Sequence, residues 1–165
     1  MPLTELPFQL PGRIFRSPMP FGGYDPEGKI LSEFKEKSIS VIVLLSDDEE
    51  CLRKTGRNLR ALYKNEGFDV IYLPIPDFGI LSIEDLKQAV FETIRQARAG
   101  RHVVVHCYAG IGRTGLFVSF LAKEIFGISG KDSMEWVRRY IPGAVETHDQ
   151  RELILRDETG PRKLV

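Results

Sequence analysis

The chain has 165 residues, of which 42% are hydrophobic, and this size suits one domain with a single buried core. Its 23 basic and 23 acidic residues balance to a formal net charge of +0, which argues against binding to nucleic acid or to an anionic membrane. Two cysteines form no disulfide framework, and neither a signal peptide nor a membrane-spanning stretch is recognisable. We therefore expect one cytoplasmic domain over residues 1–165, monomeric, with no nucleic-acid or membrane partner.

Short β-branched runs predict strands, and apolar residues spaced three or four apart predict helices. The proline-rich residues 1–12 are expected to be an extended segment, and residues 157–165 a tail. In between, the predicted order is strand 13–15, helix 27–37, strand 41–45, helix 49–64, strand 68–73, helix 83–98, strand 103–106, and helices 114–126, 131–140 and 147–156. The alternation predicts an α/β fold with a central, mostly parallel, twisted sheet of four to five strands flanked by about six helices.

Residues 106–115 lie where a predicted apolar strand meets a predicted helix, which is where α/β proteins bind ligands. Two of the five residues between Cys107 and Arg113 are glycine, and glycines allow successive backbone N–H groups to converge on an anion. The positive end of the helix that begins near Thr114 points to the same place. These surroundings favour the nucleophilic thiolate form of a cysteine, and an arginine fork binds two oxygens of a phosphate.

The run of His106 and Cys107, five residues, then Arg113 and Thr114 resembles the signature of the protein tyrosine phosphatase superfamily, and the length resembles its small atypical dual-specificity members. The resemblance extends over residues 10–155. It implies that Cys107 forms a cysteinyl-phosphate, that Thr114 eases departure of the sulfur and that His106 supports the cysteine. The implied phosphate-binding residues are Tyr108, Ala109, Gly110, Ile111, Gly112 and Arg113.

Two other interpretations of this loop are weaker. Cys107 could be an ordinary buried thiol beside a solvated arginine. Gly110, Gly112 and Gly115 also match the G-x-G-x-x-G dinucleotide motif, but the acid expected about 20 residues further on falls in a helical pattern rather than after a strand. No cofactor and no metal site are predicted.

Asp77 follows the predicted strand 68–73, so it is expected at the same sheet edge as Cys107. On residue type alone, Asp77 is equally well explained as part of a turn or as a proton donor. The family resemblance implies that it is the general acid. The resemblance also implies that Gln150 orients the attacking water, although Gln150 and Thr147 equally match a capping box.

The predicted function is a protein phosphatase that acts on phosphotyrosine, and on phosphoserine or phosphothreonine, so its partners are phosphorylated proteins. A phosphoinositide or small phosphate-ester phosphatase is the first alternative, although related lipid phosphatases place lysines in the loop where this chain has Tyr108 and Ile111. A rhodanese-like sulfurtransferase and a phosphoprotein-binding module are further alternatives. The acidic run 47–50 could repel polyanions at the site or simply suit a helix N-terminus. Cys51 could form a disulfide with an oxidised Cys107 or be a buried thiol.

Overall fold

The described part of the chain, residues 3–76 and 81–156 of this computed structural model, contains a five-stranded sheet in the order β1-β2-β5-β3-β4. β1 runs antiparallel to β2, and all other neighbouring strands are parallel. The sheet therefore matches the prediction of four to five mostly parallel strands. The strands are β1 (Thr4–Leu6), β2 (Ile14–Ser17), β3 (Ile39–Leu44), β4 (Asp69–Tyr72) and β5 (His102–His106).

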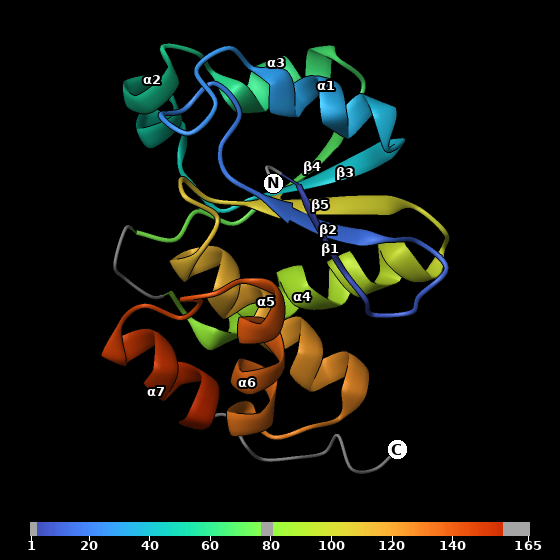
Figure 1. Cartoon of the computed structure of the whole chain (residues 1–165), viewed down its shortest axis with the longest axis vertical. Coiled ribbons are helices and arrows are strands. Elements are labelled where there is room, and N and C mark those ends of the chain that lie inside the picture. Colours follow the sequence, from blue (N-terminus) through green and yellow to red (C-terminus); the bar gives the residue numbers. More distant parts are fainter. Residues whose placement is uncertain (1–2, 77–80, 157–165) are drawn as a thin grey trace.

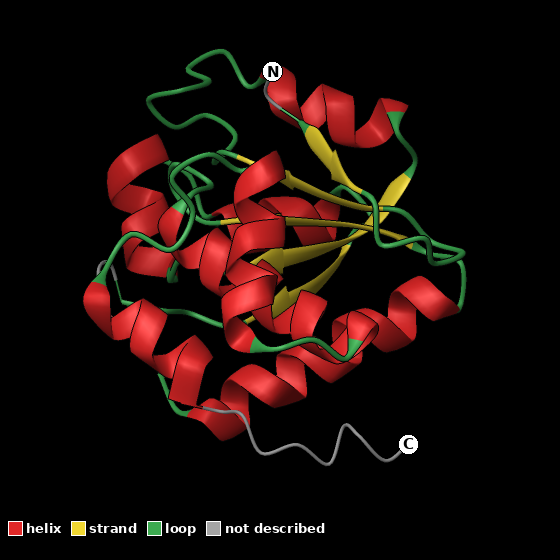
Figure 2. Ribbon diagram, turned by 60° about the horizontal axis from the view of Figure 1, so that its bottom comes forward, coloured by secondary structure: helices red, strands yellow, loops and turns green. Residues whose placement is uncertain are grey.

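Helices cover both faces of the sheet, as Figures 1 and 2 show. One layer holds α1 (Lys29–Glu36), α2 (Asp48–Thr55) and α3 (Leu59–Asn65), and the other holds α4 (Ile83–Arg98), α5 (Gly112–Phe126), α6 (Gly130–Tyr140) and α7 (His148–Arg156). The buried strand residues alternate between the layers: Val104 packs with the first, and Val103 and Val105 with the second. The predicted α/β fold is therefore confirmed. No helix in the described ranges is both long and apolar enough to cross a bilayer.

Apart from shifts of element bounds by a few residues, the structure differs from the predicted elements in two places. The single helix expected at 49–64 is two helices, because Gly56 adopts a left-handed φ of 73° that ends α2, and the side chain of Asn58 caps α3 by accepting a hydrogen bond from the Ala61 amide at 3.0 Å. The segment expected to be merely extended contains β1, in which Leu6 pairs with Ile14 of β2. The tail at 157–165 lies outside the described residues.

The topology places the end of β5 at the centre of one sheet edge. β5 lies between the parallel strands β2 and β3, and His106 is in register with Ser17 of β2 and Leu44 of β3. The loop that follows His106 is therefore flanked by the chain that leaves β2 and the chain that leaves β3. This is the edge at which parallel α/β sheets bind their ligands.

Candidate active site

Cys107 lies directly after β5 and is 2% exposed. The Thr114 hydroxyl, in the first turn of α5, donates a hydrogen bond to the Cys107 sulfur at 3.2 Å. Residues seven apart in the sequence thus meet because the loop between them curls back on itself. The sequence predicted this pair of neighbours.

The loop backbone is held from outside by Arg16, a side chain of β2. Its Nε donates to the carbonyl oxygen of Gly110 at 3.1 Å, and a terminal nitrogen donates to that of Ala109 at 3.3 Å. Gly110 has a φ of 79°, and a Cβ there would stand 2.5 Å from the Ser17 carbonyl oxygen, so the position requires glycine. Arg16 therefore fixes the direction of two carbonyl groups of the loop.

Helix α5 begins at Gly112, two residues before the predicted start. Its N-cap residue, Ile111, makes no side-chain cap hydrogen bond in the described structure. The first amides of a helix have no partner within the helix and carry its positive dipole end, so they attract an anion. The start of α5 therefore places a positive dipole end beside the loop.

Arg113 is 4% exposed and forms a two-pronged ion pair with Glu50 of α2, with N–O distances of 2.8 and 2.9 Å. It also donates to the Ile75 carbonyl oxygen at 3.1 Å. Burial raises the pKa of Glu50, but hydrogen bonding and charge from Arg113 outweigh it, and the net pKa is lowered. A charged carboxylate therefore fixes the direction of the guanidinium.

His106 is fully buried beneath the loop, and burial lowers its pKa to about 4. Its Nδ1 lies 2.8 Å from the Cys107 carbonyl oxygen, which can only accept, so Nδ1 carries the proton. Nε2 of the neutral ring then accepts from the Tyr63 hydroxyl at 2.8 Å. His106 is thus positioned as structural support rather than as a titrating base near pH 7.

A pocket of about 210 Å³ opens above the loop. Its lining brings together six of the predicted site residues: Cys107, Tyr108, Ala109, Gly112, Arg113 and Gln150. Gly110, Ile111, Thr114 and His106 are not among the lining residues, although Thr114 contacts the sulfur. Tyr24 and Glu146 complete the lining, and the sequence had not indicated either. Asp77 lies outside the described residues.

Gln150 is buried and forms the predicted capping box with Thr147. Its backbone amide donates to the Thr147 hydroxyl at 3.1 Å, and its Oε1 accepts from the amides of Thr147 at 3.2 Å and Glu146 at 2.9 Å. The side chain also lines the pocket. The capping interpretation is confirmed, and the water-orienting role stays a prediction.

Arg16 and Glu50 hold the loop and were missed because neither is near it in the sequence. Glu50 belongs to the acidic run 47–50, whose position after a predicted strand at the same sheet edge was the available signal. The structure favours the helix-terminus explanation of this run: Asp47 caps α2 through the Glu50 amide at 2.7 Å, and Asp48 pairs with Arg60. The charged side chain that lies over the Tyr108 ring is basic: Lys54 Nζ is 4.5 Å from the ring centre.

Cys51 is buried in the layer of α1, α2 and α3, and both cysteines are free thiols. Burial, together with the charges of Glu50, Asp48 and Asp47, raises the pKa of Cys51 to about 12. This keeps Cys51 protonated and weakly nucleophilic. The proposed disulfide with Cys107 stays a prediction.

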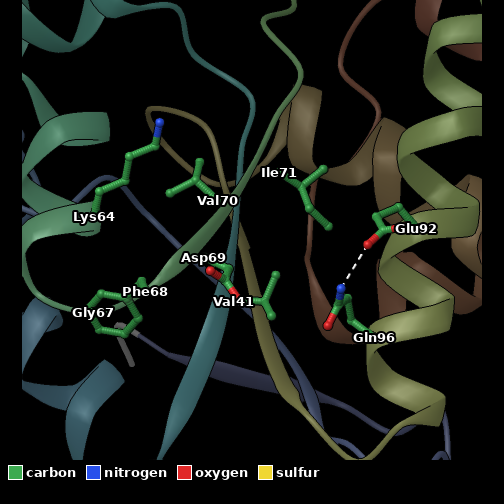
Figure 3. Close-up of a pocket in the computed structure, with 9 residues that line it drawn as sticks. All are labelled: Val41, Lys64, Gly67, Phe68, Asp69, Val70, Ile71, Glu92 and Gln96. Carbon is green, nitrogen blue, oxygen red and sulfur yellow. Dashed lines mark hydrogen bonds between the residues drawn. The ribbon is translucent and has the colours of Figure 1, made fainter.

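A second hollow, of about 580 Å³, lies beside the edge strand β4 and is shown in Figure 3. Its walls are residues from β3, β4 and the ends of α3 and α4, including Lys64, Asp69 and Gln96. Gln96 donates to Glu92 at 2.7 Å, drawn as a dashed line in Figure 3. The hollow contains no cysteine, and among the described residues no group of three or more His, Cys, Asp or Glu could hold a metal ion.

The architecture and the thiol loop define a class of protein, the α/β proteins that hold a cysteine in an anion-binding loop after a central strand. A family model described as "Polymorphic toxin system, DSP-PTPase phosphatase" matches residues 22–124, more than half of the chain. The chain therefore belongs to this phosphatase family, as a small atypical dual-specificity type of the cysteine-dependent superfamily. The family resemblance seen in the sequence is confirmed.

Known proteins support this assignment. An uncharacterised protein of Methanocaldococcus jannaschii is 38% identical over 87 residues, which is 52% of this chain and 56% of that relative, so the match spans little more than half of the relative. The crystal structure of Tk-PTP in its active form has a TM-score of 0.75 and 29% identity, with 91% and 92% of the two chains covered. Kinase associated phosphatase shares the fold, with a TM-score of 0.83, 21% identity and 92% and 90% coverage.

Proposed function

We propose that the chain is a cysteine-dependent phosphatase that removes phosphate from phosphotyrosine, and from phosphoserine or phosphothreonine, in proteins. The observation that carries the proposal is the Cys107 sulfur, which lies 3.2 Å from the Thr114 hydroxyl. Cys107 lines a pocket together with Arg113 and with Gly112, the first residue of α5. The geometry combines a nucleophile with donors for a phosphate. Family membership supports the same conclusion.

In the first step, the Cys107 thiolate attacks phosphorus, the bond to the leaving oxygen breaks, and a cysteinyl-phosphate forms. Arg113 and the loop amides stabilise the charge on the phosphoryl oxygens. A protonated Asp77 supplies the proton to the leaving oxygen. A hydrogen bond supports this assignment: the Arg113 guanidinium donates to the carbonyl oxygen of Ile75, which stands two residues before Asp77 in the sequence.

The surroundings of the pocket favour a side-chain phosphate ester. The loop has a tyrosine, Tyr108, and no lysine between Cys107 and Arg113. The Tyr108 hydroxyl accepts a hydrogen bond from the Gly23 amide at 3.2 Å, which connects the loop to the segment that carries Tyr24. The rings of Tyr24 and Tyr108 lie 5.6 Å apart, and Tyr24 is 64% exposed. An exposed aromatic wall beside a pocket of about 210 Å³ suits an aromatic phosphate ester that inserts from a peptide.

The test is release of p-nitrophenol from p-nitrophenyl phosphate in the presence of a chelator, followed by phosphate release from a panel of phosphopeptides and phosphoinositides. Wild type is expected to be active on the aryl ester and on phosphopeptides, and Cys107→Ser is expected to be inactive. The matched control is Cys51→Ser, which removes the other thiol. Activity that survives Cys107→Ser would refute the mechanism.

Each alternative has its own signature in the same panel. A preference for phosphoinositides would mean that these, and not phosphoproteins, are the substrate. Thiosulfate activity without phosphatase activity would indicate a sulfurtransferase. Stable capture of a phosphopeptide by wild type without phosphate release would indicate a binding module.

A further inference from the structure

Two basic side chains lie beside the mouth of the pocket above Cys107. Lys54, in the last turn of α2, has its Nζ 4.5 Å from the ring centre of Tyr108, which lines the pocket. Arg57 follows α2, and its guanidinium carbon lies 4.0 Å from the ring centre of Phe21. Both side chains are exposed, and neither forms an ion pair with a carboxylate among the described residues. Their charge is therefore available to an anion at the pocket mouth.

The two aromatic rings belong to one supported surface. The rim segment, residues 19–24, is bonded twice to Tyr108: the Met19 amide donates to the Tyr108 carbonyl oxygen at 2.9 Å, and the Gly23 amide donates to the Tyr108 hydroxyl at 3.2 Å. A Cβ on Gly23 would stand 2.5 Å from that hydroxyl, so glycine permits the close approach. The two cations thus rest on a surface whose backbone is held against the phosphate-binding loop.

The rim segment is also strained at Phe21. This residue has a φ of 67°, which L side chains rarely adopt, and its ring fills the space that a Cβ on Gly28 would need, 2.1 Å from the nearest ring atom. Asp25 holds the turn by accepting a hydrogen bond from the Ile30 amide at 3.1 Å. Strained backbone persists only where its surroundings impose it, often at functional sites. Here it places an aromatic ring under the Arg57 guanidinium.

Stabilisation of α2 explains only part of this arrangement. The dipole of a helix favours a basic residue in its last turn, and Lys54 has that position. Arg57, however, lies two residues beyond Thr55, the last residue of α2. Neither cation–π contact uses up the donors, because an ammonium has three N–H groups and a guanidinium has five.

Another part of the pocket is acidic. Glu146 is the one carboxylic acid among the described lining residues, and a Cβ on Gly112 would stand 2.3 Å from its Oε1, so it lies against the start of α5. Its backbone is fixed by α6 and α7: Val145 has a strained φ of 64°, Arg138 donates to the Val145 carbonyl oxygen at 3.2 Å, and Gln150 Oε1 accepts from the Glu146 amide at 2.9 Å. An anionic part of a substrate is therefore drawn to the α2 side of the pocket.

We propose that Lys54 and Arg57 form a subsite for an anionic group close to the phosphorylated residue of a substrate protein, an inference that rests on the proposed function. The group is an acidic side chain or a second phosphate, because both present the oxygens that an ammonium and a guanidinium fork bind. When a phosphorylated side chain enters the pocket beside Tyr108, the neighbouring residues of an extended peptide follow at about 3.3 Å per residue. They pass over the surface on which Lys54 and Arg57 lie.

The experiment compares kcat/KM for synthetic phosphotyrosine peptides. One peptide has alanine at three positions on either side of the phosphotyrosine, a second series places glutamate at each of these positions in turn, and a third places phosphoserine there. Wild type should prefer the best glutamate peptide over the alanine peptide by about 3–10-fold, as expected for two exposed charge contacts. The preference should be larger for a second phosphate, which carries more charge, and should fall as salt is added.

Substitutions of the two cations test their role through the ratio of kcat/KM values, in which any general loss of activity cancels. Lys54→Ala combined with Arg57→Ala should lower the glutamate-to-alanine ratio to below about twofold. Lys54→Glu combined with Arg57→Glu should reverse the preference in favour of lysine-flanked peptides. Lys64→Ala is the matched control, because Lys64 is an exposed lysine on α3 beside the other hollow, and it should keep the wild-type ratio.

Equal turnover of all peptides by wild type, or a wild-type ratio in the double alanine variant, would overturn the inference. A role of Lys54 and Arg57 in turnover of phosphoinositides alone would overturn it as well. A preference confined to the phosphoserine peptides would support it and assign the subsite to a second phosphate. If wild type releases no phosphate from any phosphopeptide in a Cys107-dependent manner, the proposed function fails, which is a different result.

Discussion

Two hollows among the described residues differ in size and in chemistry, and the smaller of them has the features of an active site. The hollow beside β4 has a volume of about 580 Å³, against about 210 Å³ for the pocket above Cys107. Yet the larger hollow lies along an edge strand, whereas the smaller one lies at the carboxyl edge, where a loop and a helix start converge beside a thiol. Chemical composition and position in the topology therefore identify the site better than volume does.

Among the substitutions that test this comparison, the largest loss of activity is expected at the ion pair that orients Arg113. Arg113→Lys should lower kcat/KM by on the order of 10³-fold, because an ammonium cannot replace the planar fork in binding phosphoryl oxygens. Glu50→Gln should lower it by roughly 10²-fold through misdirection of the guanidinium, and should reduce the free energy of unfolding by about 3 kcal/mol because a buried charge loses its partner.

The measurements are steady-state kinetics and urea denaturation, with Glu49→Gln as the control, since Glu49 is the exposed neighbour on α2. Equal kinetics for Glu50→Gln and Glu49→Gln would show that the ion pair does not orient Arg113.

A smaller effect is expected from His106 and appears in the pH dependence of stability. Its pKa is about 4 in the folded chain and 6.5 when exposed, so the unfolded state binds the proton more readily. Stability is then fully present above pH 6.5 and is lost as the pH falls toward 4, by on the order of 3 kcal/mol from this group. His106→Asn should flatten that part of the profile.

Denaturant unfolding at several pH values between 4 and 7 measures this difference, and His148→Asn, at an exposed position, should keep the wild-type slope. An unchanged slope in His106→Asn would mean that the buried imidazole does not titrate as the structure indicates.

The smallest effect is expected in the larger hollow. Lys64 is exposed on its rim, so Lys64→Ala should leave kcat/KM within about twofold of wild type and change the free energy of unfolding by no more than about 0.5 kcal/mol. A large loss of activity in the same p-nitrophenyl phosphate assay would reverse the comparison between the hollows.

Several features of the fold could be predicted from local patterns. The helix at α4 has the predicted bounds, Ile83–Arg98, because its apolar spacing and its Ser82 cap are both written in neighbouring residues. The break after α2 was missed because apolar spacing continues across Gly56, and only the left-handed turn there separates the two helices. β1 was missed because three residues flanked by prolines gain strand structure only by pairing with β2.

The loop from His106 to Thr114 could be predicted from the sequence, because its residues are contiguous and a strand-to-helix turn is sufficient to bring them together. The residues that support and complete that loop could not, because they come from distant parts of the chain. Glu50 lies 63 positions from Arg113, and Arg16 lies 94 positions from Gly110. Such partners meet because parallel strands deliver their ends to one edge of the sheet, and Glu146 reaches the same edge because α6 and α7 hold a strained backbone in place.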